Sequence, residues 1–191
     1  MAALSVSDGS PSNGYSLLEA YREFVTACEA VRNEEAFEPV LTRRGWEKYE
    51  PEAGEPMGRA MSYLAKERWR FEKDGEASVN NPVTFRQKIG DEQFELMVQE
   101  IQVDGGLIIG CRAWNFHPSK APSLDKLVEL KAEQPSRKMS SPDLLLAEWG
   151  ESNDGVVLGS QVYFIPPDSP NAKAIGAGGL SFKMSFVRIS E

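Results

Sequence analysis

The chain has few of the side chains that most catalytic and metal sites need. Among its 191 residues there is one histidine, His117, and there are two cysteines, Cys28 and Cys111. A zinc site needs several such ligands close together, and no pair stands at the usual ligand spacing. His117 follows Cys111 by about 20 Å of extended strand, which is too far for a catalytic dyad. We therefore predict no catalytic, cofactor-binding or metal-ligating residues.

Long apolar runs are also missing. No stretch approaches the roughly 20 apolar residues that span a bilayer, so we predict no membrane span. Lysine and arginine total 21 against 29 aspartate and glutamate residues, which gives a net charge of -8. This acidic balance repels phosphate backbones unless a local basic patch overrides it, so we predict no nucleic-acid partner. A basic partner protein or a cationic ligand suits the electrostatic field of this negative net charge better.

The first part of the chain carries helical patterns. Ser16 and Glu19 have the spacing of a capping box, and apolar residues then recur at helical spacing. Gly45 is the expected stop of a second helix. The sequence predicts helices over 16–32, 34–44 and 59–66. From Arg68 onward we expect extended chain, with Trp69 facing inward and its basic neighbours facing outward.

The later segments have the pattern of strands joined by tight turns. Apolar and polar residues alternate between turn pairs such as Gly90-Asp91, which is typical of an antiparallel meander. Strands are predicted over 83–89, 94–103, 107–113, 156–165 and 180–189. The segment 143–149 has features of both a helix and a strand, and we assign it to a strand. The apolar phase shifts beside Gln99 and Glu100, which indicates a β-bulge.

One more helix is expected between the strand groups, beginning at Ser123 and closed by Pro135. This order of elements predicts an α+β fold, in which N-terminal helices pack on a mainly antiparallel sheet with one further helix between strand groups. We expect 1–15 to be a flexible lead-in and 16–191 to form a single α+β domain.

Several short patterns look like functional motifs but have simpler explanations. Ser123 and Lys126 match the Ser-x-x-Lys pattern of penicillin-recognising enzymes, yet the companion Lys-Thr-Gly is missing and Ser123 suits a helix cap. The glycine-rich piece 176–179 precedes a strand, whereas a phosphate cradle needs a following helix. The basic and aromatic run 66–73 fits an alternating strand. The long loop over 166–179 is a candidate binding lip.

The two cysteines fall on predicted buried surfaces. Cys28 lies on the apolar stripe of the first helix, and Cys111 shares a strand face with Leu107 and Ile109. If that helix covers that face, a disulfide can form, and closing a loop of roughly 84 residues would stabilise the fold by about 4.5 kcal/mol. Two buried free thiols are the alternative.

One pattern combines a helix, a glycine–tryptophan pair and a strand, carried by Phe24 and Cys28, Gly45 and Trp46, and Gly110 and Cys111. In these positions, within roughly the first 115 residues, the chain resembles a group of small uncharacterised bacterial exported proteins. The resemblance implies that the helix and strand cysteines pair, and it implies no known activity. The chain departs from this group in having no signal sequence at its start.

No motif in the sequence assigns an activity. The leading hypothesis is a non-enzymatic binding or protein-interaction domain, with an unidentified protein or small ligand as its partner and no cofactor. The alternative is a hydrolase or thiol enzyme without a recognisable motif. Two compartments stay open, because the chain is cytoplasmic if Met1 is the native start and periplasmic or secreted if a signal peptide was removed.

Overall fold

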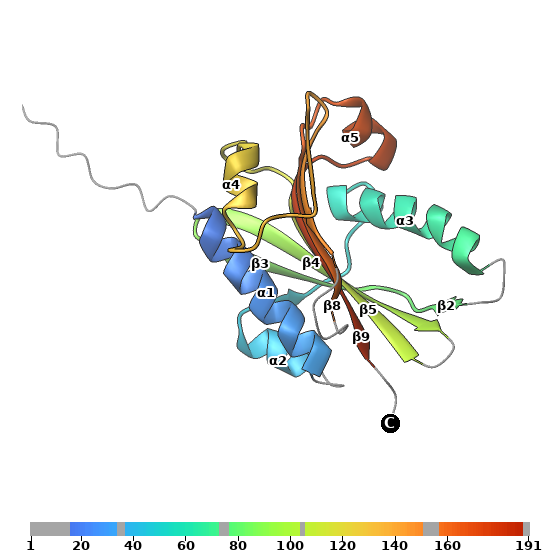
Figure 1. Ribbon diagram of the computed structural model, residues 1–191. Coiled ribbons are helices and arrows are strands. Elements are labelled where there is room, and N and C mark those ends of the chain that lie inside the picture. The colour runs from blue at the N-terminus through green and yellow to red at the C-terminus, as the bar shows by residue number, and fades with distance from the viewer. Residues whose placement is uncertain (1–15, 34–36, 73–76, 104–105, 151–156, 189–191) are drawn as a thin grey trace, which may run out of the picture.

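The computed structural model describes residues 16–33, 37–72, 77–103, 106–150 and 157–188, with only the backbone described for 67–72, Ala77, Val157 and Arg188. In these residues five helices flank a nine-stranded antiparallel sheet, which confirms the predicted α+β class (Figure 1). The helices are α1 (Leu17–Asn33), α2 (Phe37–Arg43), α3 (Pro56–Glu72), α4 (Leu124–Val128) and α5 (Pro170–Ile175). No described helix is both long enough and apolar enough to cross a membrane.

The strands form one sheet in the order β1-β3-β4-β5-β9-β8-β7-β6, with β2 also paired to β4. Their bounds are β1 (Glu47–Lys48), β2 (Ala77–Val79), β3 (Val83–Ile89), β4 (Glu92–Val103), β5 (Gly106–Asn115), β6 (Arg137–Ser141), β7 (Leu144–Trp149), β8 (Val157–Ile165) and β9 (Gly179–Arg188). Every neighbouring pair is antiparallel. The C-terminal strand β9 lies in the middle, between β5 and β8.

The sheet has two faces with different covers, because successive side chains of a strand point to opposite sides. The disulfide face carries Leu96, Val98, Cys111 and Phe182, and α1, α2 and α4 pack on it. The other face, here called the α3 face, carries Met97, Arg112, Trp114 and Lys183, and α3 and α5 lie over part of it. Figure 1 shows the two groups of helices on opposite sides of the sheet.

Aromatic rings form the centre of the disulfide face. Phe182 of β9 is fully buried, and its ring centroid lies 5.5 Å from those of Tyr21 and Phe24 and 6.0 Å from that of Phe94. Such ring pairs add to the stability that comes from burying their apolar area. The predicted apolar stripes of the first helix and the last strand therefore meet in this core.

The expected helix signals are present in the structure. The amide of Glu19 donates to Ser16 Oγ at 3.3 Å, which caps α1. Gly45 has a φ of 91° just after α2, a conformation that glycine adopts readily. Ser123 caps α4, but this helix ends at Val128 rather than near Pro135.

Extended chain from Arg68 onward is contradicted, because α3 begins at Pro56 and stays helical to Glu72. A short alternating run does not separate a strand from a helix, and this run is rich in lysine, arginine and glutamate, which favour helix. Which way Trp69 faces lies outside the described side chains. The lead-in over 1–15 and the turn at 154–155 also lie outside the described residues.

The strand predictions need three corrections. Strands β1 and β6 were not expected, since Glu47–Lys48 is very short and Arg137–Ser141 lacks apolar alternation. The loop over 166–179 contains α5, capped by Ser169. The irregularity expected beside Gln99 and Glu100 is absent from the pairing of β4 with β5, and it lies on the other side of β4, where the register changes by one residue between Val83↔Val98 and Val79↔Ile101. The assignment of 143–149 to a strand is confirmed by β7.

Candidate binding groove

The two cysteines meet where α1 crosses β5. Cys28 and Cys111 form a disulfide with a Cα–Cα distance of 5.9 Å, and both are fully buried on the disulfide face. Of the two alternatives that the sequence left open, the structure has the one in which the two sulfurs lie at disulfide distance. Because these are the only cysteines in the sequence, neither sulfur is a free thiol nucleophile in this structure.

The other motif residues have local structural roles. His117 is exposed just beyond β5, and its backbone amide donates to Asn115 Oδ1 at 3.0 Å. Ser123 Oγ accepts from the amide of Lys126 at 3.4 Å, while Lys126 Nζ pairs with Glu129 at 2.5 Å. Among the described residues no cluster of three or more histidine, cysteine, aspartate or glutamate side chains could hold a metal ion.

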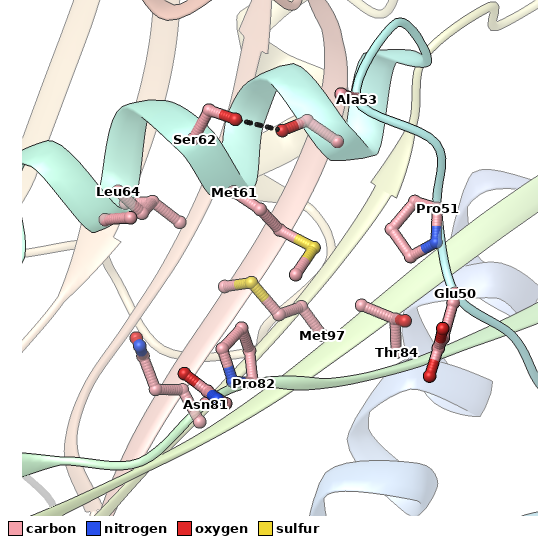
Figure 2. A pocket seen from close by; sticks show the side chains of 13 residues that line it. Glu50, Pro51, Ala53, Met61, Ser62, Leu64, Asn81, Pro82, Thr84 and Met97 are labelled. Atoms are coloured by element: carbon pink, nitrogen blue, oxygen red, sulfur yellow. Dashed lines mark hydrogen bonds between the residues drawn. The ribbon is translucent and has the colours of Figure 1, made fainter.

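A cleft of about 500 Å³ lies between α3 and the sheet (Figure 2). Its apolar walls are Met61 and Leu64 of α3 and Met97 of β4, and Figure 2 shows the two methionine side chains extending toward each other. The other lining residues are Glu50, Pro51, Ala53, Gly58, Ser62, Ala65, Asn81, Pro82, Thr84 and Gln99. The cleft, called the groove below, therefore has apolar and polar sides.

Hydrogen bonds hold two walls of the groove in place. The backbone amide of Tyr49 donates to Thr84 O at 3.1 Å, and Thr84 Oγ1 donates back to Tyr49 O. This exchange fixes the segment before α3 against β3. Ser62 Oγ donates to Gly58 O at 2.9 Å, so this hydroxyl is engaged within α3 itself (Figure 2).

The start of α3 is fixed by a close approach to its own entry loop. A Cβ on Gly58 would lie 2.0 Å from Glu52 O, so the position requires glycine. The guanidinium of Arg59 donates from Nε to Gly176 O at 2.6 Å and from Nη1 to Gly54 O. These contacts tie α3 to the entry loop and to the end of α5.

A half-buried ionisable pair, Tyr49 and Glu95, lies beside the groove on the same face. Tyr49 Oη donates to Glu95 Oε2. Burial raises the pKa of Glu95 above its usual range, and burial followed by the contact with Glu95 raises the pKa of Tyr49. Arg86 lies over the Tyr49 ring at 5.2 Å and pairs with Glu47 at 3.0 Å. Each group thus has a protein partner, which is typical of a structural network.

Two basic side chains continue the sheet wall of the groove. By register, Met97 lies opposite Arg112 of β5, and Arg112 lies opposite Lys183 of β9. Both basic residues are half-buried. The Arg112 guanidinium stands 5.0 Å from the centre of the Trp114 ring. Burial and then the charge of Arg112 lower the pKa of Lys183.

The sequence contained one signal for this groove, which was misinterpreted. The apolar phase of β4 shifts after Val98 because Met97 and Ile101 turn toward the α3 face, where a second cover exists. We expected a bulge there, since one buried face was assumed. Which sheet face α3 covers depends on tertiary packing that the sequence pattern does not encode.

Comparison with known proteins leaves the groove without a precedent. No family model matches the chain, and neither a curated protein nor a solved structure matches it. Function must therefore be inferred from the groove and its surroundings.

Proposed function

We propose that this chain is a non-enzymatic binding protein whose ligand is a small molecule with an apolar body, held in the groove. One observation carries the proposal: Met61, Leu64 and Met97 surround a cleft of about 500 Å³ that polar side chains border. Small-molecule sites have volumes of about 300–1,000 Å³ and combine apolar walls with a few polar groups. The groove has this size and this mixture.

The groove also has the mechanical properties of a binding site. Methionine side chains are flexible and polarizable, so Met61 and Met97 can adapt to the shape of an apolar ligand. The backbone around them is held by Gly58, Arg59 and Thr84, so little order has to be gained on binding. A preformed frame with adaptable walls supports binding of one class of ligand.

The alternative of a hydrolase or thiol enzyme has no observation in its favour. The sulfurs of Cys28 and Cys111 are bonded to each other, and Ser123 caps α4. His117 is exposed just beyond β5, and among the described residues its side chain forms no hydrogen bond with Cys28, Cys111 or Ser123. We therefore propose binding alone.

We also propose that the protein works outside the cytoplasm, in an oxidising compartment. The Cys28–Cys111 disulfide supports this, because cytosolic reductants keep most thiols reduced. The test is intact mass after denaturing alkylation of protein from its native host, with and without prior reduction. Export requires that alkylation depend on reductant. Free alkylation of both cysteines would place the protein in a reducing compartment.

The groove can be tested with an uncharged fluorescent probe such as N-phenyl-1-naphthylamine. Ala65 is exposed on α3 and lines the groove, whereas the next residue, Lys66, is exposed and does not line it. We expect Ala65→Trp to fill the groove and weaken probe binding roughly tenfold or more, and Lys66→Trp to leave binding unchanged. Both variants should unfold at the urea concentration of the wild type.

Two outcomes would contradict the proposal. The first is failure of the wild type to bind the probe, which would mean that no apolar body fits the groove. Equal binding by wild type and Ala65→Trp would place the probe elsewhere on the surface. In either case the groove would lose its role as the ligand site.

A further inference from the structure

A row of polar side chains crosses the α3 face next to the groove. Successive cross-strand pairs from β6 to β4 place Arg137, Glu148, Gln161, Lys183, Arg112 and Met97 in one line. Met97, at the end of this row, is also a wall of the groove. The polar row therefore crosses five neighbouring strand pairs and reaches the groove at Met97.

Two cations in this row stand directly opposite each other. Arg112 and Lys183 are register partners on β5 and β9, which are central strands of the sheet. Residues directly opposite each other on neighbouring strands have Cβ atoms about 4.5–5.5 Å apart, and two charges of the same sign at that distance destabilise the sheet. The pair occurs in a protein of net charge -8, where acidic residues are more numerous than basic ones. Stability therefore does not explain why these two cations lie opposite each other.

Among the described residues, no carboxylate forms an ion pair with Arg112 or Lys183. Glu148 is the acidic member of the row, and it already accepts from Gln161 Nε2 at 2.7 Å and lies 3.8 Å from Arg137 Nη1. Lys183 forms no ion pair or side-chain hydrogen bond with the described residues, although the charge of Glu148 reaches it weakly. Arg112 contacts the face of Trp114. With three basic residues and one acidic residue, the row keeps a net positive charge, and its two opposed cations lie next to Met97.

We propose that the ligand is an amphipathic anion, with its apolar body in the groove and its carboxylate or phosphate group between Arg112 and Lys183. The inference rests on the proposed binding function and adds the charge of the ligand. An anion at this point would relieve the repulsion between the two cations and accept hydrogen bonds from both. At this point the positive charges of Arg112 and Lys183 outweigh the negative net charge of the chain. We therefore propose an anionic ligand in place of the cationic ligand that the net charge suggested.

The test compares three ligands that share one alkyl chain: decanoate, decyl phosphate and decanol. The affinity of each ligand is measured from its displacement of the uncharged fluorescent probe from the groove. We expect one or both anions to bind roughly tenfold or more tightly than decanol, because both cations can donate charge-assisted hydrogen bonds to the anionic group. A preference between decanoate and decyl phosphate would tell whether the natural group is a carboxylate or a phosphate.

Matched variants assign this preference to the cation pair. Lys183→Gln and Arg112→Gln should reduce the affinity for the anions to that for decanol, with the affinity for decanol unchanged. Lys138→Gln removes the same charge from an exposed residue on β6, opposite Ala147 and off the polar row, and it should keep the preference. Urea unfolding of each variant shows that the fold is retained, and Arg112→Lys restores charge at that position if the glutamine variant is unstable.

The outcomes separate the two proposals. Equal binding of decanol and both anions, with probe binding intact, would overturn the anion site and leave the groove. Loss of preference in Lys138→Gln as well would assign it to the general field of the protein and also overturn the site. Failure of the wild type to bind the probe and all three ligands would overturn the groove itself.

Discussion

The two faces of the sheet differ in what their side chains do. On the disulfide face, Phe182 and its aromatic neighbours fill a large core closed by Cys28 and Cys111. On the α3 face the apolar cluster is smaller, and beside it lie a cleft and the opposed cations Arg112 and Lys183. Residues that alternate along one strand, such as Phe182 and Lys183, therefore belong to quite different environments.

This difference shows how a single sheet can divide stability and binding between its faces. A groove forgoes packing contacts, and opposed like charges reduce stability. A fold is stable by only about 5–15 kcal/mol, so such features need compensation elsewhere in the structure. The disulfide face supplies that compensation through burial and a covalent cross-link. The following predictions test this division, beginning with the largest expected effect.

Removing the disulfide should have the largest effect on stability. The double variant Cys28→Ala and Cys111→Ala releases a loop spanning a sequence separation of 83. The chain-entropy model gives a loss of about 4.5 kcal/mol in the free energy of unfolding. Urea denaturation of wild type and variant measures the loss. Probe binding to the groove should persist where the variant stays folded, and its disappearance in folded protein would mean that the faces are coupled.

Phe182→Ala should have the next largest effect. The ring is fully buried against Tyr21, Phe24 and Phe94, so its removal leaves a cavity among rigid aromatic neighbours. We expect a loss of about 3–5 kcal/mol by urea denaturation. A loss below about 1 kcal/mol would show that this core can repack, and the contrast between the faces would then weaken.

Alkaline pH should act on the disulfide face through Tyr21. Burial, and then the charge of Glu133, raises the pKa of Tyr21 from 10.0 to about 12. The folded state keeps this proton longer than the unfolded state, so the stabilising contribution is complete below pH 10 and is lost as the pH rises through 12. The loss is about 3 kcal/mol, since one pKa unit corresponds to 1.36 kcal/mol.

The measurement for Tyr21 is urea denaturation of wild type and Tyr21→Phe between pH 9 and 12. The difference in unfolding free energy should shift in favour of the variant as the pH rises. Tyr49 is present in both proteins, so its titration cancels in the difference. A difference that does not change with pH would mean that Tyr21 titrates normally in the folded state.

Lys183→Met should have the smallest effect on stability and the opposite sign. Removing one of two opposed cations should raise the unfolding free energy by about 0.5 kcal/mol, the typical scale of a cross-strand pair. High salt should reduce the gain, because it screens the repulsion in the wild type. Urea denaturation at low and high salt measures both. A clear destabilisation would show that Lys183 has a structural role.

The sequence predicted the elements of the disulfide face better than those of the α3 face. Alternation in 107–113 and 180–186 and the helical stripe ending near Arg32 are regular patterns, and they predicted one core and the position of both cysteines. The α3 face depends on features without such a pattern. Nothing in the local sequence around Met61 shows that this residue will lie opposite Met97.

The sequence also could not predict that the two cations Arg112 and Lys183 lie opposite each other. Arg112 and Lys183 are distant in the chain and become partners only because β9 pairs with β5. The strands predicted from alternation carry no information on their order in the sheet. The groove and its cations are therefore consequences of strand pairing, and they required the structure.

The central position of β9 has a consequence for how the protein is made. Strands β1 to β5 and β6 to β8 each pair among themselves, but only β9 joins the two groups. Until residues 179–188 leave the ribosome, the edges of β5 and β8 that face β9 have no partner, so the sheet cannot be completed before this strand is available. A chain cut before β9 would expose two open edges, and we expect it to aggregate rather than remain as a smaller domain.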